Sequence, residues 1–363
     1  IWVDVLGVTQ VGLDDDFFAL GGHSLLATRV IARIRNQFNA DVPLRLLFNN
    51  PNPAALLQAM ASQQQRPASQ TVRRRNSTDL PPLSFAQKRL WFLDQLRPGN
   101  SAFNLPWMVR LQGDLSLPAL QAALDALLNR HESLRTRFAA SGGDPLQLVM
   151  PVQSLPITLH NCFGADDVRL EAELRELIAR PFDLQQGPLI RADLFRVTAD
   201  DHVLLLLMHH IVSDGWSMGV IYRELSVLYA HYCNTTSALP VLPELAVQYA
   251  DYAIWQREWL AGNEFPKQLA YWRKQLSGMP PLLSLGADYP RPTTQSYAGA
   301  WLNLELPKTL SKELSVLAGT QGCSTFMLLL SVFKVLLARY AGSEDIVVGT
   351  PVAGRQRTEL EAQ

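Results

Sequence analysis

Four apolar residues recur at intervals of four near the start of the chain: Leu26, Val30, Ile34 and Phe38. This spacing places them on one face of an amphipathic helix. A second, shorter helix is predicted after Pro53, because proline is well accommodated in the first turn of a helix. We therefore predict a small bundle of three or four helices over residues 1–61.

Helical and strand periods alternate after residue 80. Helices are predicted at 117–128, 217–232 and 324–340, and strands at 203–211 and 345–352. The strand at 203–211 is apolar on both faces up to its two histidines, which indicates burial on both sides. The helix at 217–232 is expected to bury Val220, Leu225, Leu228 and Tyr232. Interleaved helices and strands indicate an α/β architecture for this part of the chain.

A linker is predicted between these two parts. Residues 62–79 lack apolar periodicity and are rich in Gln, Ser and Arg, which is typical of a linker. Arg73–Arg75 could bind an acidic partner, but such a run is more often solvated, and we interpret it as a solvated part of the linker. Fully extended, the segment would reach roughly 60 Å, so the flanking domains could reorient substantially.

The composition indicates a folded protein of two or three domains. The chain has 363 residues, of which 48% are hydrophobic. A formal net charge of -1 argues against nucleic acid or an anionic membrane as the main partner. Three cysteines without CxxC spacing fit a reducing cytoplasm better than a disulfide framework. No signal peptide or membrane span is predicted, and the missing initiator methionine suggests a piece of a longer polypeptide.

A Gly-Gly-His-Ser turn precedes the first long predicted helix. Gly21 and Gly22 allow a sharp turn, which would present Ser24 at the helix start. Ser24 could be a simple N-cap, but that interpretation does not explain the paired glycines. A P-loop is excluded because no Lys-Ser or Lys-Thr pair follows. A nucleophile elbow is excluded because Leu26 occupies the position of its last glycine.

Two adjacent histidines end the apolar run. Neighbours on a strand point to opposite faces, so His209 and His210 are expected to have different roles. Both could be satisfied core histidines, since unpaired polar groups are costly to bury. No metal site is predicted, because a third strong ligand is missing nearby. Ser213 or Ser217 as a hydrolase nucleophile would lack the elbow.

Asp214 and Gly215 follow where the strand leads into a loop. A carboxylate here could pair with an arginine or hold the loop. The glycine lets a reacting group come close to the backbone, and its N–H could face an oxyanion.

Residues 17–30, FFALGGHSLLATRV, resemble the phosphopantetheine attachment motif of peptidyl carrier proteins in nonribosomal peptide synthetases. The resemblance implies that Ser24 carries 4'-phosphopantetheine through a phosphodiester, with an aminoacyl or peptidyl thioester on its thiol. A hydroxyl at a helix start suits this role, because the helix dipole favours a phosphate there.

The pattern His-His-x-x-x-Asp-Gly resembles the active-site motif of condensation domains, which belong to the chloramphenicol acetyltransferase-like superfamily. Three other strings resemble motifs of that family, in the same order: 83–96, 130–138 and 247–256. The resemblance implies a four-helix all-α carrier bundle followed by an α/β condensation domain. It divides the chain into a carrier (1–61), a linker (62–79), a first lobe (80–260) and an incomplete second lobe (261–363).

The resemblance also implies residue roles. His210 is the expected catalytic residue, either as a base or as a group that positions the amine. Gly215 is assigned to loop geometry and oxyanion contact, and His209 to structure. Asp214 is expected to pair with one of the arginines of residues 130–138, Arg130 or Arg135.

The implied reaction is amide bond formation between a donor acyl thioester and the amine of an aminoacyl thioester, in antibiotic or siderophore biosynthesis. The implied partners are an upstream adenylation domain, a downstream carrier domain and a phosphopantetheinyl transferase. Residues 84–93 resemble domains that accept an L-configured donor. Alternatives are an epimerisation domain, an acyl-CoA-dependent acyltransferase, or a non-catalytic module that docks carriers. A cyclisation domain would have paired aspartates in place of the histidines, and a starter domain would not follow a carrier.

Overall fold

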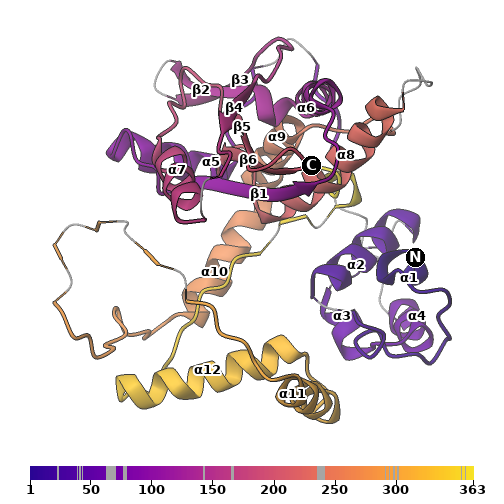
Figure 1. Cartoon of the computed structure of the whole chain (residues 1–363). Helices are drawn as coiled ribbons and strands as arrows, with labels where there is room; N and C mark the ends of the chain where they lie inside the picture. The colour runs from indigo at the N-terminus through magenta and orange to yellow at the C-terminus, as the bar shows by residue number, and fades with distance from the viewer. Residues whose placement is uncertain are drawn as a thin grey trace. The chain divides into compact units, whose positions relative to one another are not determined.

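The computed structural model describes all residues except 23, 39, 41, 43, 63–70, 77–79, 142–143, 165–166, 235–241, 291, 294, 297–298, 301, 353 and 356 (Figure 1). Internal contacts divide the chain into two units. One contains residues 1–69 and 263–357, and the other contains residues 70–262 and 358–363.

Residues 1–62 form the predicted helical bundle. Its helices are α1 (Trp2–Leu6), α2 (Ser24–Phe38), α3 (Leu44–Asn49) and α4 (Pro53–Ser62). Their apolar faces share one core, in which Phe17, Val30 and Leu47 are fully buried. Phe38 was expected on the buried face of α2 but is 53% exposed, because it is the last residue of that helix.

The second unit is built around a four-stranded sheet in the order β1-β6-β5-β4 (Figure 1). Its strands are β1 (Asn104–Gln112), β4 (Ile157–Asn161), β5 (Ile190–Arg196) and β6 (Asp201–His209). A separate hairpin pairs β2 (Thr136–Ser141) with β3 (Asp144–Val149). β4 and β5 are parallel, and β6 is antiparallel to both of its neighbours.

β6 is buried on both faces, as its apolar run predicted. Leu204, Leu206 and Met208 pack in a cluster with helices α6 (Leu117–Arg130) and α8 (Gly215–Cys233). Alternate residues, among them Leu205 and Leu207, pack in a second cluster with α5 (Phe85–Leu96) and α7 (Asp167–Ala179). The period of two along a strand explains why one strand serves both clusters.

The predicted helices at 117–128 and 217–232 correspond to α6 and α8. Ser116 caps α6, and Pro118 lies in its first turn. Val220, Leu225 and Leu228 of α8 are buried as expected, whereas Tyr232 is 38% exposed. The unit also contains α9 (Tyr249–Trp259) and the 3-10 turns Glu132–Arg135 and Thr358–Leu360.

The described residues of 263–357 include the helices α10 (Phe265–Gln275), α11 (Lys308–Thr320) and α12 (Thr325–Ala341). The chain is kinked at Leu260–Glu264, between α9 and α10, where Gly262 has non-helical φ and ψ angles of −80° and −156°. The predicted helix at 324–340 is confirmed as α12, but the strand predicted at 345–352 is not formed. β-structure requires a hydrogen-bonded neighbour, and none pairs with these residues in the described chain.

The described helices are short or polar compared with a membrane span. No single helix among them has both the length and the apolar character that crossing a membrane needs. α11 and α12 meet the criterion as a pair, but they are bent by 102° relative to each other.

Candidate active site

β6 ends at two histidines with opposite environments. His209 is the last residue of the strand and is 1% exposed, whereas His210 follows it in a turn and is exposed. The N–H of His210 donates to the carbonyl of Phe103 at 2.8 Å. The N–H of Ile211 donates to Nδ1 of His209 at 3.1 Å. These two hydrogen bonds fix the backbone of the turn that carries the exposed side chain of His210.

Burial, and to a smaller extent the neighbouring His210, lowers the pKa of His209 from 6.5 to about 4. His209 is therefore neutral near pH 7, and its Nδ1 accepts the bond from Ile211. The rings of Phe103 and Phe182 lie 6.2 and 6.3 Å from its ring. This environment fits the structural role expected for His209.

Asp214 caps the N-terminus of α8. Its Oδ1 accepts hydrogen bonds from the N–H of Ser217 at 2.9 Å and from the hydroxyl of Ser217 at 2.8 Å. The prediction that Asp214 forms an ion pair with Arg130 or Arg135 is wrong. Arg130 pairs instead with Glu224 of α8, and Arg135 donates to the carbonyl of Met150.

The carboxylate of Glu224 binds two side chains of the motif at 130–138, those of Arg130 and His131. Nε of Arg130 lies 3.1 Å from each carboxylate oxygen, and Nε2 of His131 lies 2.6 Å from Oε2. Burial acts to raise the pKa of Glu224, but His131 and Arg130 outweigh it and the net pKa is lowered. Glu224 was not predicted as a site residue. Its position four residues after Val220, on the buried face of α8, was a signal that it needed a partner.

Gly215 is the first residue of α8 and is exposed. A Cβ atom placed on it would meet no atom within 4 Å, and its φ angle is not in the left-handed region. The backbone therefore does not require glycine here, contrary to the role in loop geometry that we expected. The expected close approach of a reacting group to its N–H stays a prediction.

The motif at 83–96 contacts the histidine turn through Gln87, which also belongs to the capping box at the start of α5. The hydroxyl of Ser84 accepts from the N–H of Gln87 at 3.2 Å, and Oε1 of Gln87 accepts from the N–H of Ser84 at 2.9 Å. Nε2 of Gln87 also donates to the carbonyl of Ile211 at 3.4 Å. The spacing Ser-x-x-Gln before an apolar run was a readable signal for this cap.

Helix α9, which contains most of the motif at 247–256, holds the start of α5. Tyr249 shares a 3.0 Å hydrogen bond between its hydroxyl and that of Ser84. Oε1 of Gln256 accepts from the N–H of Phe85, and Arg257 donates twice to the carbonyl of Leu83. The first and fourth motifs are therefore joined by hydrogen bonds that no local pattern could reveal.

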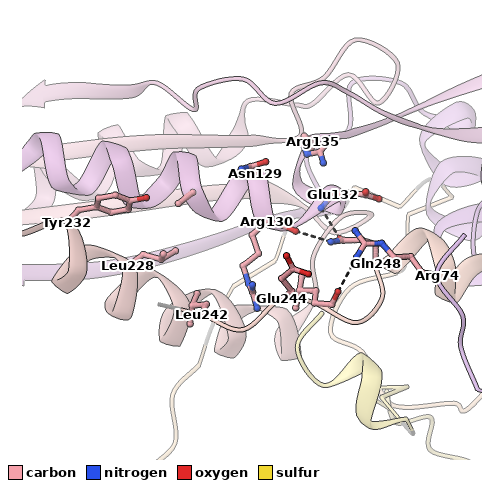
Figure 2. A pocket seen from close by; sticks show the side chains of 12 residues that line it. Arg74, Asn129, Arg130, Glu132, Arg135, Leu228, Tyr232, Leu242, Glu244 and Gln248 are labelled. Carbon is pink, nitrogen blue, oxygen red and sulfur yellow. Dashed lines mark hydrogen bonds between the residues drawn. The ribbon is translucent and has the colours of Figure 1, made fainter. Parts of the chain in front are cut away.

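Gln248 joins the fourth motif to the second. Its Nε2 donates to the carbonyl of Arg130 at 2.9 Å, and its Oε1 accepts from the N–H of Glu132 at 3.1 Å (Figure 2). Arg130 and Arg135 line a cavity of about 520 Å³ beside this junction, together with Arg74 and Tyr232 (Figure 2).

Gly21 and Gly22 of the helical bundle are each required for a different structural reason. Gly21 has a φ of 92°, in the left-handed region that favours glycine. A Cβ atom on Gly22 would lie 2.4 Å from the carbonyl oxygen of Phe17, so the chain passes too close for a side chain. The N–H of Gly22 donates to that oxygen at 2.9 Å. The sharp turn predicted before Ser24 is therefore present, and α2 begins at Ser24.

A phosphopantetheine group fits this helix start. α2 is 15 residues long and has no acidic residue in its first turn, so its N-terminus favours a phosphate. His23 and the side chain of Ser24 lie outside the described part of the structure.

Two family models match the chain. Residues 77–363 match the model described as "Condensation domain", and residues 1–60 match the model described as "Phosphopantetheine attachment site". Residues 61–76 belong to neither match.

Curated relatives resemble nearly the whole chain. A linear gramicidin synthase of Brevibacillus parabrevis is 45% identical over 365 residues, and malpibaldin synthetase of Mortierella alpina is 42% identical over 367 residues. Each alignment covers 99% of this chain but 7% of the relative. The chain therefore spans a small part of the relatives that it matches.

Solved structures share the fold of the second part. The X-domain from teicoplanin biosynthesis has a TM-score of 0.67 and 29% identity, and the match covers 75% of this chain and 60% of that one. The SgcC5 protein from Streptomyces globisporus has a TM-score of 0.61 and 30% identity, covering 78% and 65%.

Proposed function

We propose that this chain forms amide bonds, because it belongs to the condensation-domain family and carries a phosphopantetheine attachment domain in front. It is a carrier–condensation segment of a nonribosomal peptide synthetase. The donor is an acyl thioester, with an L-configured terminal residue. The acceptor is the amine of an aminoacyl thioester on a downstream carrier. An upstream adenylation domain and a phosphopantetheinyl transferase supply and prepare the carriers.

The different burial of the two histidines carries this proposal. His209 is sealed in the core with a pKa of about 4, so it is a poor candidate for proton transfer with a substrate near pH 7. His210 is exposed on a backbone fixed by Phe103, and an imidazole in that position can meet a substrate amine. We therefore assign the catalytic role to His210 and a structural role to His209.

The attacking amine forms a C–N bond with the thioester carbonyl, and the C–S bond breaks as the thiol leaves. His210 accepts a proton from the nitrogen, or holds the amine in line for attack. The N–H of Gly215, at the start of α8, faces the oxygen that gains negative charge. Asp214 keeps that helix start in place through its two bonds to Ser217.

Ser24 is the proposed attachment residue for 4'-phosphopantetheine. When bound, this group supplies the thiol that carries the acyl cargo. Holding both reactants on carriers replaces affinity for free substrate, because a tethered group reaches effective concentrations in the millimolar range.

A synthetase containing this segment tests the proposal directly. With donor and acceptor carriers loaded, we expect a dipeptidyl thioester on the acceptor carrier by intact-mass analysis. Turnover with free acyl-CoA and no carrier would favour the acyl-CoA-dependent acyltransferase. Inversion at the Cα of a loaded residue would favour the epimerisation domain.

The carrier assignment has its own test. Incubation with coenzyme A and a phosphopantetheinyl transferase should add the mass of one phosphopantetheine, and Ser24→Ala should abolish that gain. No gain in the parent chain, or a gain that survives the substitution, would contradict the assignment.

A further inference from the structure

Residues 71–76, here called the anchor segment, precede the condensation-domain match but pack against that domain. Val72 is 5% exposed and lies in a core cluster with Val247 and Leu360. Its N–H donates to Oε1 of Glu359 at 3.4 Å. An apolar side chain buried between two distant parts of the domain indicates a specific fit rather than a chance contact.

Arg75 of the anchor segment is held by two carboxylates. Its Nη2 lies 2.6 Å from Oε2 of Glu132, and its Nη1 lies 2.9 Å from Oδ1 of Asp251. The backbone N–H of Arg75 donates to the same Oδ1 at 3.2 Å. The side chains of Arg75, Glu132 and Asp251 are 11%, 18% and 0% exposed. The interpretation of Arg73–Arg75 as solvated charge is therefore wrong for Arg75.

The two carboxylates need this arginine. A buried acidic group without a counter-charge is strongly unfavourable, and a guanidinium can serve two carboxylates with separate nitrogens. Asp251 already accepts the N–H of Gln248 at 2.7 Å in the cap of α9, and that bond leaves its negative charge uncompensated. The domain therefore presents an acidic site beside the apolar side chains of Val247 and Leu360, and this arrangement matches the Val-Arg-Arg-Arg sequence of the segment.

We propose that this surface of the condensation domain is a docking site for the anchor segment, and that the tether of the carrier begins there rather than at residue 80. This inference rests on the proposed function of the bundle as a carrier. The docking site comprises Glu132, Val247, Asp251, Glu359 and Leu360.

Docking of the anchor segment limits how far the carrier can move from the condensation domain. Between Ser62, where α4 ends, and Val72, the chain has ten residue steps, which span at most about 35 Å. The whole of 62–79 would reach roughly 60 Å. A shorter tether also raises the effective concentration of the carrier at the condensation domain. For a flexible chain, shortening the tether from 18 residues to ten raises this concentration about twofold. The docked anchor segment therefore favours delivery of the carrier's acyl group to sites near the docking site.

The docking site is shared with the motifs that surround the histidine turn. Glu132 belongs to the motif at 130–138, and Asp251 belongs to the motif at 247–256. The side chain of Gln248, in the motif at 247–256, bonds to the backbone of Arg130 and Glu132 in the other motif. The segment that leads from the carrier is therefore bonded to the same polar network as the candidate active site.

Limited proteolysis of the full chain by trypsin tests the docking. The protease needs an accessible, locally extended stretch, so a docked segment is cut slowly. The other arginine of this region, Arg66, is followed by proline, which disfavours cleavage there. We expect Arg75→Ala to speed cleavage within 71–76 at least tenfold relative to the parent chain.

Arg73→Ala is the matched control, because it removes one cleavage position from the same triplet and Arg73 is exposed. It should leave the rate at the parent value. Equal rates for Arg75→Ala, Arg73→Ala and the parent chain would overturn the proposal.

A second pair of variants applies if Arg75→Ala does not fold. Val72→Asp places a charge in the apolar cluster with Val247 and Leu360, whereas Thr71→Asp introduces the same charge at an exposed neighbour. Faster cleavage for Val72→Asp alone supports docking, and equal rates contradict it. This assay needs neither cofactor nor substrate, so its failure is distinguishable from failure of the proposed reaction.

Discussion

His209 and His210 are consecutive in the sequence, yet one is sealed in the core and the other is exposed. The alternation of a strand predicted that they would differ, and the apolar run predicted burial up to the end of the strand. The partner of Asp214 was not predictable in the same way. Arg130 finds Glu224 because α6 packs on α8, and that packing is not encoded in spacing along the chain.

The buried His209 should make stability depend on pH. Its pKa is about 4 in the folded chain and near 6.5 when unfolded, so the unfolded state binds more protons between these values. Stability is therefore full above pH 6.5 and is lost as the pH falls toward 4. Between pH 7 and pH 5 the expected loss is about 2 kcal/mol.

Urea unfolding at several pH values measures this loss. His209→Asn removes the titrating group, so its stability should fall less steeply than that of the parent chain over this range. Parallel curves for the two proteins would show that His209 does not have the lowered pKa.

Glu224 offers a second test at the scale of one residue. Glu224→Gln leaves Arg130, whose side chain is only 16% exposed, without its counter-charge, and breaking a largely buried pair costs about 3 kcal/mol. The same change at Glu171, which pairs with Arg175 on the exposed face of α7, should cost less than about 0.5 kcal/mol. Chemical denaturation of both variants makes the comparison, and equal losses would contradict the assigned role of Glu224.

Helix α5 shows how an element is held by others distant in the sequence. Ser84→Ala removes both its N-cap and the hydrogen bond to Tyr249, so we expect a loss of about 2 kcal/mol. Ser116→Ala is the control, because Ser116 caps α6 through its hydroxyl without such a side-chain partner among the bonds described. Its expected cost is about 1 kcal/mol.

The same pair of variants reports on the site. α5 carries Gln87, which donates to the carbonyl of Ile211, so Ser84→Ala should also slow amide formation, whereas Ser116→Ala should not. If both variants keep the parental rate, α5 does not position the histidine turn.

Elements were predictable where local pattern decides them. The long apolar run of β6 and the periodic faces of α6 and α8 correspond closely to the structure. The strand predicted at 345–352 failed because strand formation depends on a pairing neighbour, which hydrophobicity alone does not supply. The paired glycines predicted a turn, but the approach of Gly22 to Phe17 became visible only in three dimensions.

At the scale of the whole chain, the bundle and the α/β fold followed from the periodicity on either side of a polar segment. That segment is where composition was least informative. Residues 62–79 looked uniformly like a linker, yet Val72 and Arg75 are packed in the second unit. Composition reports average polarity, whereas docking depends on two side chains that meet matching groups.

In the proposed reaction, the exposed His210 at the end of β6 promotes amide formation between carrier-bound partners. The most direct measurement is the single-turnover rate of dipeptidyl thioester formation in a synthetase containing this segment, with both carriers loaded, for the parent and His210→Ala. We predict a rate at least about 100-fold lower for the variant, with an unchanged melting temperature and slow residual product from tethering alone. A rate within about threefold of the parent would contradict the catalytic role of His210.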